Sequence, residues 1–343
     1  MAASRILVTG GTGYIGSHTV VELLAKGFEV VVADNLSNSR AEVLNSLQTI
    51  SGKMIDFVTV DFCDNSAVTE LFRHKQIDAV IHFAAFKAVN ESVEMPMKYY
   101  RNNLVSLMNL IDAALKYKVM NLVFSSSCSV YGEPDVLPVN ENAELKRAES
   151  PYGYTKQICE QMLRDISKVS KLKTIALRYF NPVGAHESVM IGEFPINPPN
   201  NLVPVITQTA IGKRKEMLVY GTDYNTKDGS AIRDYIHVVD IAKAHVLAIE
   251  RMVQNKSVQH FELFNLGTGT GFTVLEVITA FERVSKQKLN YKLSPRREGD
   301  VEKIYADTKL ANEVLGWFAE KSLDEMLDSS WRWEKQLAGK GNS

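Results

Sequence analysis

The chain has 343 residues, of which 45% are hydrophobic and 23% are charged, and this ordinary composition excludes a mostly disordered or low-complexity protein. Its 39 Lys and Arg residues and 40 Asp and Glu residues give a formal net charge of −1, which provides no basic footprint for nucleic-acid binding. The length suits about two domains or one large α/β unit.

Short apolar runs alternate with helical stretches through the first half of the chain. The first run, Arg5–Thr9, leads into a helical pattern over residues 14–26 that stops at Gly27, and a second apolar run follows at residues 29–33. Apolar strand runs separated by helices indicate a parallel sheet covered on both faces, in a doubly wound α/β fold. Further strands are expected at residues 57–60, 79–83 and 122–125, and long helices at residues 97–118 and 152–170.

The alternation breaks after Leu177, where the proline-rich residues 184–201 predict a long ordered loop that enters a smaller lobe. We therefore expect a Rossmann-type NAD-binding domain over residues 1–180, which also carries the catalytic residues. A smaller C-terminal α/β substrate lobe is expected over residues 181–343, with some segments returning to the first domain. In that lobe the sequence predicts strands at residues 218–221, 261–266 and 289–293 and helices at residues 273–285 and 309–315.

A glycine-rich turn joins the first strand to the first helix. It reads GGTGYIG, with Gly10, Gly13 and Gly16 three residues apart. Such a turn lets backbone approach a pyrophosphate, while the helix N-terminus offers unpaired N–H groups and a positive dipole. Asp34 ends the second strand, where a carboxylate accepts hydrogen bonds from the adenosine ribose and repels a 2′-phosphate. The pattern predicts NAD as the cofactor, and Arg40 leaves NADP as the weaker alternative.

A tyrosine and a lysine four residues apart, Tyr152 and Lys156, open a predicted helix after Pro151. Residues i and i+4 share one helix face, so the phenol and the ammonium project together. A phenol has a pKa of about 10 and acts as a base near neutral pH only when a nearby positive charge stabilises the phenolate. Ser127 follows a predicted strand at the carboxyl edge of the sheet, where its hydroxyl can bind a reacting hydroxyl or carbonyl group. These three residues are the candidate catalytic set for moving a hydride and a proton at one carbinol carbon; the alternative is an ordinary surface helix and turn.

Neither a metal site nor a membrane span is expected. The three cysteines are far apart, and no Cys/His spacing suits zinc or a disulfide framework. His237 and His245 are interpreted as structural or surface residues. The most apolar stretch, residues 79–86, is far shorter than the ~20 residues that cross a bilayer, and the N-terminus runs directly into a strand. We therefore expect a cytoplasmic protein without a metal.

Ten ordered motifs over residues 5–333 resemble the extended short-chain dehydrogenase/reductase family, and within it the nucleotide-sugar 4-epimerases. They are GGTGYIGSHT, VVADNLSNS, VIHFAAFKAVNESVEMP, YYRNNL, FSSSCSVYG, PYGYTK, LRYFNPVGAH, PNNLVP, VYGTDYNTKDGSAIRDYIHVVD and REGD. The resemblance implies NAD, a UDP-hexose substrate, and reversible C4 epimerisation of UDP-glucose and UDP-galactose through a transient 4-keto sugar. Beside the glycines, it implies NAD contacts from Tyr14, Ile15, Asp34, Asn35, Leu36, Ser37, Asn38, Ser39, Asp61, Phe62, Phe83, Ala84, Ala85, Lys87, Asn102, Ser127, Tyr152, Lys156 and Phe180.

The resemblance also implies separate roles within the site. Asp61 would hold the adenine amino group, Lys87 would reach the pyrophosphate, and Phe180 would lie near the nicotinamide. A diphosphate suits guanidinium groups that bind two oxygens at once, which fits Arg233 and Arg297. The implied nucleotide-sugar contacts are Ser127, Tyr152, Asn181, Asn201, Leu202, Tyr220, Arg233, Arg297 and Asp300.

Other activities stay open beside this one. Nucleotide-sugar dehydratases of the family carry an acidic residue just after the active hydroxyl, whereas this chain has Cys128 and Ser129. An NAD-dependent sugar dehydrogenase would release NADH, and a catalytically idle NAD-sensing subunit would share the fold. Ile304 falls where relatives carry either a bulky tyrosine or a small residue, so UDP-GlcNAc/UDP-GalNAc epimerisation is a further alternative.

Two further features concern surfaces and loops. The loop at residues 186–192 lacks the Pro-Ser-Gly usual in relatives, and Phe194 replaces a common acid. The helices expected at residues 97–118 and 152–170 carry apolar residues on more than one face. Relatives use this pair of helices in a four-helix dimer contact, so the resemblance implies a homodimer.

Overall fold

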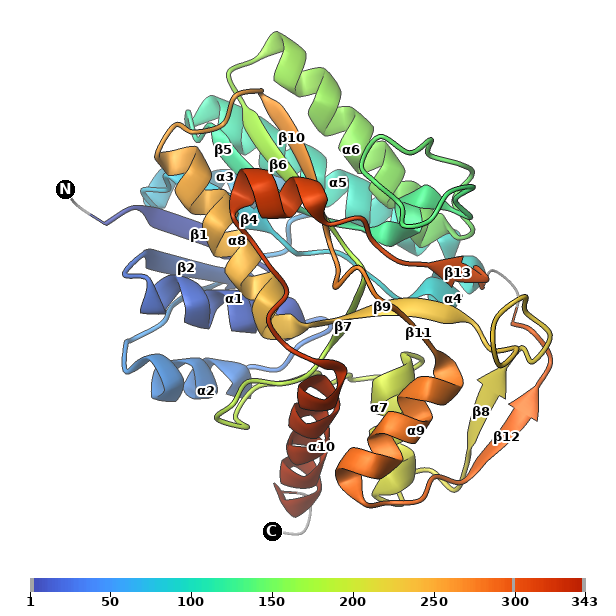
Figure 1. Cartoon of the computed structure of the whole chain (residues 1–343). Coiled ribbons are helices and arrows are strands. Elements are labelled where there is room, and N and C mark those ends of the chain that lie inside the picture. The colour runs from blue at the N-terminus through green and yellow to red at the C-terminus, as the bar shows by residue number, and fades with distance from the viewer. Residues whose placement is uncertain (1–2, 298–299, 341–343) are drawn as a thin grey trace.

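A seven-stranded parallel β-sheet forms the centre of the computed structural model, which describes residues 3–297 and 300–340 (Figure 1). The chain runs outward from the middle strand in one direction and then in the other, which confirms the predicted doubly wound fold. Ligands bind such sheets beyond the carboxyl ends of the strands, where the strand order reverses. In sheet order the strands are β10 (Phe261–Leu266), β6 (Lys173–Tyr179), β5 (Asn121–Ser127), β4 (Ala79–His82), β1 (Arg5–Thr9), β2 (Glu29–Asp34) and β3 (Asp56–Thr59).

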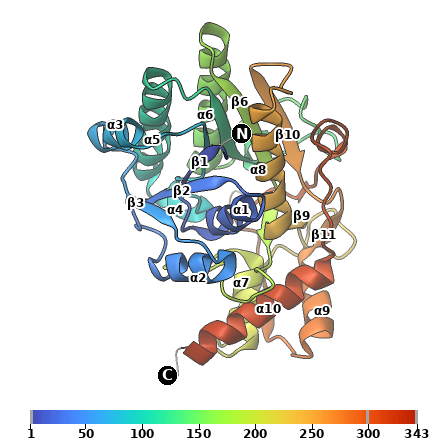
Figure 2. The ribbon, with the colours of Figure 1, turned by 90° about the vertical axis from the view of Figure 1, so that its left-hand side faces the viewer.

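Helices cover both faces of this sheet, as the apolar strand runs predict. Alternate side chains of a strand point to opposite faces, so Ile6 and Val8 of β1 pack in one hydrophobic core and Leu7 packs in another. Figure 2 shows the sheet between the two helix layers. The first layer contains α1 (Tyr14–Ala25), α2 (Glu42–Ser51) and α8 (Val238–Val253); the second contains α3 (Asn65–His74), α5 (Pro96–Lys116) and α6 (Pro151–Val169).

Small sheets and helices make up the smaller lobe, around a core that includes Ile206, Phe281 and Leu327. The strand β8 (Met217–Tyr220) pairs with β12 (Tyr291–Ser294), and β9 (Ile232–His237) pairs with β7 (Asn181–Val183), β11 (Gly271–Thr273) and β13 (Lys303–Ile304). The helices of this lobe are α7 (Leu202–Ala210), α9 (Val274–Ser285) and α10 (Leu323–Lys340). In the described part of the chain, no helix is long and apolar enough to span a membrane.

The expected elements of the first half all lie within two residues of the observed bounds. The assignment of residues 261–266 to the smaller lobe was wrong. The strand β10 instead pairs in parallel with β6, with Phe261 opposite Thr174, because the helix α8 carries the chain back to the edge of the large sheet. The strand expected at residues 289–293 begins two residues later, and the helix expected at residues 309–315 includes a π-helical turn, η2 (Ala311–Leu315). The domain boundary at residue 180 stays a prediction.

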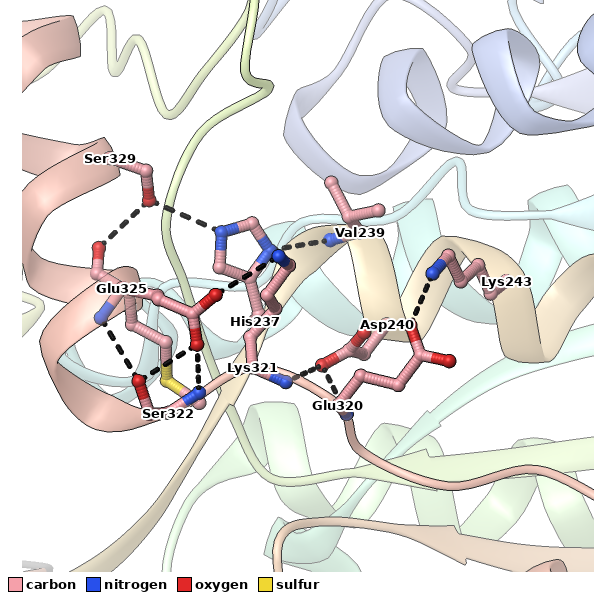
Figure 3. A network of polar contacts seen from close by, with 10 residues as sticks. His237, Val239, Asp240, Lys243, Glu320, Lys321, Ser322, Glu325 and Ser329 are labelled. Atoms are coloured by element: carbon pink, nitrogen blue, oxygen red, sulfur yellow. Dashed lines mark hydrogen bonds and ion pairs between the residues drawn. The ribbon is translucent and has the colours of Figure 1, made fainter.

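A polar network ties the start of α8 to the start of α10 (Figure 3). The His237 ring accepts a hydrogen bond from the backbone N–H of Val239 at the start of α8, and its other nitrogen lies 3.2 Å from the Ser329 hydroxyl of α10. The buried Asp240 carboxylate accepts the backbone N–H groups of Glu320 and Lys321, each at 3.0 Å. The network therefore fixes the C-terminal helix against the large sheet. His237 serves the fold here, as the sequence interpretation allows.

Candidate active site

A cavity of about 720 Å³ lies beyond the carboxyl ends of the central strands, between the large sheet and the smaller lobe. Its volume lies within the roughly 300–1,000 Å³ typical of small-molecule sites. Of the predicted NAD contacts only Leu36 is outside its lining; the Leu36 backbone N–H donates to Asp34. The predicted cofactor residues that line the cavity are Gly10, Gly13, Tyr14, Ile15, Gly16, Asp34, Asn35, Ser37, Asn38, Ser39, Asp61, Phe62, Phe83, Ala84, Ala85, Lys87, Asn102, Ser127, Tyr152, Lys156 and Phe180.

The glycine turn has a geometry that other residues do not permit. Gly10 has a φ of +67°, and a Cβ on it would lie 2.9 Å from the backbone nitrogen of Ala84. A Cβ on Gly16 would lie 2.2 Å from the carbonyl oxygen of Gly10, so α1 packs directly on the turn. Gly13 precedes α1 and gives it no side-chain cap. The first N–H groups of α1 therefore face the cavity edge without a side-chain acceptor, which suits a phosphate.

The Asp34 carboxylate closes the other side of this turn. It accepts hydrogen bonds from the backbone N–H of Thr12 at 3.2 Å and from the Ser39 hydroxyl at 3.1 Å, and its side chain is buried. A carboxylate offers about four acceptor positions, and with the Leu36 N–H three of them are occupied, so it retains acceptor capacity for a ribose hydroxyl at the cavity wall. A dinucleotide with free ribose hydroxyls fits this donor and acceptor set, and a 2′-phosphate would meet a buried negative charge.

The strand β5 and the helix α6 bring the three candidate catalytic residues into the same cavity. Ser127 ends β5. The Ser150 hydroxyl accepts the N–H of Gly153 at 3.2 Å, and this N-cap fixes the first turn of α6, which carries Tyr152 and then Lys156. The Lys156 ammonium lies 6.0 Å from the centre of the Tyr152 ring, so both side chains share a helix face as the spacing predicts.

Burial dominates the protonation of this pair. It raises the pKa of Tyr152 to about 12, and hydrogen bonding to Ser127 acts in the opposite direction. Burial also lowers the pKa of Lys156 to about 8. The expected lowering of the Tyr152 pKa is not seen in this structure, because desolvation outweighs the stabilising contacts. The lysine nevertheless stays protonated near neutral pH, and its buried charge lies beside a half-buried phenol at the cavity wall.

A second group of polar side chains lies on the wall formed by the smaller lobe. The Asp300 carboxylate pairs with Arg297 at 2.8 Å and lies 3.7 Å from Arg233, so two guanidinium groups converge on one anion. Tyr220 is outside the lining, but its ring centre lies 5.6 Å from the Arg297 guanidinium carbon. Leu202, at the start of α7, is also outside the lining. The predicted substrate contacts that line the cavity are Ser127, Tyr152, Asn181, Asn201, Arg233, Arg297 and Asp300.

The sequence reasoning missed part of the cavity wall. The loop expected between the two lobes folds over the cavity and contributes Glu193 and Phe194, and α10 contributes Trp333. The prolines in this loop indicated a loop, but no residue pattern indicated which surface it covers. Within residues 3–297 and 300–340, no cluster of three or more His, Cys, Asp or Glu side chains could hold a metal ion. Residues 298 and 299 of the REGD motif lie outside the described residues.

Comparisons with known proteins give one consistent result. Residues 7–330 match the sequence profile of the family described as GDP-mannose 4,6 dehydratase. The chain is 51% identical to a UDP-glucose 4-epimerase of Bacillus subtilis over 330 residues, which are 96% of each chain. Its fold is similar to that of a UDP-glucose 4-epimerase of Stenotrophomonas maltophila, crystallised with NAD and formylated UDP-arabinopyranose, with a TM-score of 0.95, 43% identity, and coverage of 98% and 99% of the two chains. A UDP-glucose 4-epimerase of Bifidobacterium longum, in complex with NAD+ and UDP, gives a TM-score of 0.93 at 44% identity, with coverage of 97% and 98%.

Proposed function

We propose that Ser127, Tyr152 and Lys156 carry the chemistry of this chain, which belongs to the UDP-glucose 4-epimerases of the extended short-chain dehydrogenase/reductase family. The chain catalyses the NAD-dependent, reversible C4 epimerisation of UDP-glucose and UDP-galactose. Bound NAD supplies a hydride acceptor for C4 of the sugar and returns the hydride to the opposite face of a transient 4-keto sugar. The reaction consumes no net oxidant, so a tightly held cofactor suffices.

The protein's part in the proposed mechanism is to move one proton and to hold the sugar. The phenolate oxygen of Tyr152 accepts the proton of the 4-hydroxyl as C4 loses its hydride, and gives the proton back when C4 regains one. The Ser127 hydroxyl donates a hydrogen bond to the O4 atom in both directions. The Lys156 ammonium stabilises the phenolate by its positive charge. Shielding from water strengthens each of these electrostatic interactions.

Inversion requires that the sugar turn over while the nucleotide stays in place. We assign the anchor to Arg233 and Arg297, whose guanidinium groups converge on the Asp300 carboxylate. A diphosphate is also a compact anion, so the same two groups suit it. The keto sugar then rotates about its link to the diphosphate and presents its other face to the cofactor.

One observation carries the proposal: a single cavity holds the glycine turn, Asp34 and the Ser127, Tyr152 and Lys156 group. The test is to incubate purified protein with UDP-galactose, with and without added NAD, to separate the products, and to follow NADH absorbance. UDP-glucose formed without accumulation of NADH supports the epimerase. Stoichiometric NADH would indicate a dehydrogenase instead, and loss of turnover in Tyr152→Phe tests the assigned base.

A dehydratase is the alternative that the name of the matching profile raises. Dehydration needs an acid beside the active hydroxyl. Positions 128 and 129 hold a cysteine and a serine, and the Ser129 hydroxyl donates to the Ser127 oxygen at 3.0 Å. The absence of a carboxyl group at these two positions favours epimerisation, and a search for 4-keto-6-deoxy sugar in the same incubation tests it.

Activity on N-acetylated UDP-sugars is a second candidate function. Ile304 lines the cavity, is 4% exposed, and is intermediate in size between the tyrosine and the small residues of relatives. The same assay with UDP-GlcNAc, compared between the parent and an Ile304→Tyr variant, tests whether this side chain sets the sugar size.

We also propose a homodimer formed through α5 and α6. Met97, Met108 and Tyr154 on these helices are 56%, 46% and 48% exposed, and Tyr100 packs edge-on against Tyr154. Large apolar side chains exposed together favour burial against a second copy. Light scattering of the purified protein tests the dimer, and Met108→Lys is expected to shift it toward monomer.

We further propose a cytoplasmic location. The three free cysteines suit the reducing cytoplasm, and cell fractionation tests this location.

A further inference from the structure

Two loops from opposite walls of the cavity meet at one stacked pair of side chains. The Arg40 guanidinium carbon lies 4.3 Å from the centre of the Phe194 ring, and both side chains line the cavity. Arg40 lies in the loop between β2 and α2, and Phe194 lies in the loop between β7 and α7. We propose that this pair, the Arg40–Phe194 clasp, closes the cavity at its Asp34 end and slows the release of NAD. The proposal rests on the NAD site of the proposed function.

The Arg40 side of the clasp is fixed to the glycine turn. The hydroxyl of the preceding residue, Ser39, lies 2.7 Å from the Thr12 hydroxyl and donates to Asp34 at 3.1 Å. In the described ranges the guanidinium group has no carboxylate within ion-pair distance, and its buried Nε has no hydrogen-bond partner. The Phe194 ring is therefore the contact that orients the cation.

The Phe194 side of the clasp is also held in place by its neighbours. Its ring meets the Trp333 ring edge-on, with centres 6.2 Å apart, and the Trp333 indole N–H donates to the Glu193 carbonyl oxygen at 2.9 Å. The Glu193 carboxylate accepts hydrogen bonds from Lys87 and Asn201, each at 3.0 Å. The loop is thus held from α10 on one side and from the cavity wall on the other. Both loops of the clasp are held in place by other contacts. The attraction between Arg40 and Phe194 therefore opposes the separation of the two loops, and does not only order a mobile loop.

The position of the clasp decides what it controls. Asp34 is predicted to accept hydrogen bonds from the adenosine ribose, Ser39 is a predicted NAD contact, and Arg40 directly follows Ser39. Both loops line the cavity that holds the glycine turn, so a dinucleotide that leaves by this end passes between them and separates the stack. A cation over an aromatic face is attracted to it, and the loss of such a contact accelerates the opening by about tenfold. The clasp acts on cofactor exchange and has no part in the proton transfer at Tyr152.

The test measures NAD exchange directly. Purified holoprotein is mixed with excess deuterated NAD, and the loss of unlabelled NAD is followed by mass spectrometry in the parent, Phe194→Ala, Arg40→Ala and the double variant. We expect each single variant to exchange about tenfold faster than the parent. The double variant should be no faster than the faster single variant, because both changes remove the same contact. Arg40→Lys, which keeps a cation, should be slower than Arg40→Ala.

Matched controls separate the clasp from general loosening. Phe318→Ala removes an aromatic side chain that is 60% exposed and outside the cavity lining, and it should exchange like the parent. Rates within twofold of the parent for both single variants, or fully additive effects in the double variant, would overturn the clasp and leave the proposed function standing. A parent protein that neither carries NAD nor takes it up would overturn the proposed function, and the clasp with it.

Discussion

The Lys156 ammonium donates a hydrogen bond of 2.6 Å to the backbone carbonyl oxygen of Ser125. This bond fixes a helix side chain to the strand that also carries Ser127, so β5 and α6 hold the serine, the tyrosine and the lysine in one arrangement. The Phe124 ring lies 4.8 Å from the ammonium and completes its surroundings. The positive charge is positioned by backbone and aromatic contacts, and the Glu160 carboxylate nearby favours the charged form.

Removal of this charge is expected to lower activity and to change its pH dependence. We expect Lys156→Met to lower kcat by about 10² or more, because the phenolate of Tyr152 loses its stabilising charge. Burial lowers the pKa of Lys156 to about 8, so kcat of the parent should fall as the pH rises through that value. A pH–rate profile of kcat for both proteins measures this. If the variant keeps the same alkaline decline, the decline belongs to another group.

The same lysine has a predictable effect on stability. Its pKa in the folded protein, about 8, is below the ordinary value of 10.5, so between these values the unfolded chain binds the proton and the folded protein does not. The Lys156 contribution to the free energy of unfolding therefore rises with pH across this window. Chemical denaturation at pH 7.5, 9 and 10.5 measures the slope, and Lys156→Met should show a smaller increase than the parent.

Breaking a buried ion pair beneath the site is expected to lower the free energy of unfolding. Arg178 donates to Glu160 through two nitrogens, at 2.8 and 2.6 Å, with both side chains at most 2% exposed, and the Ser126 hydroxyl also donates to Glu160. Arg178→Met leaves a buried carboxylate unpaired and should lower the free energy of unfolding by about 3–5 kcal/mol. The double variant Arg178→Met/Glu160→Met should recover part of that loss. Equal losses in urea denaturation of both variants would contradict the pairing argument.

The outcome of sequence reasoning follows from the range of the interactions involved. The strands of the first half and the helices α1, α5 and α6 depend on local periodicity, and the glycine turn and the Tyr152–Lys156 spacing are local as well, so these were predicted, whereas α2 and α3 were given no bounds. The place of β10 beside β6 depends on a crossover through α8, which no local pattern records. The cover over the cavity depends on contacts of Phe194 with Arg40 and Trp333. Each of these two residues is more than 100 residues away from Phe194 in the chain. The raised pKa of Tyr152 likewise comes from burial by the folded chain.

The glycine turn gives a further prediction about folding and cofactor binding. A Cβ on Gly16 would meet the Gly10 carbonyl oxygen at 2.2 Å, and neither backbone can move freely. Gly16→Ala should therefore lower the free energy of unfolding by more than about 2 kcal/mol and reduce the NAD content of the purified protein. Gly52→Ala is the matched control. Gly52 also has a positive φ, +66°, but a Cβ there meets no atom within 4 Å, so the control should lose about 1 kcal/mol and keep its NAD.

The paired arginines of the smaller lobe are expected to control nucleotide affinity. Charge-assisted hydrogen bonds contribute about 1.5–3 kcal/mol each, so Arg233→Met should weaken UDP binding by roughly 30-fold while NAD binding is unchanged. Arg296→Met is the control, because Arg296 pairs with Asp223 at 2.8 Å outside the cavity lining and should leave UDP affinity unaltered. Calorimetric titration with UDP, repeated at high salt, measures both variants. Similar losses in the two would mean that general positive charge, and not the Arg233 and Arg297 pair, attracts the nucleotide.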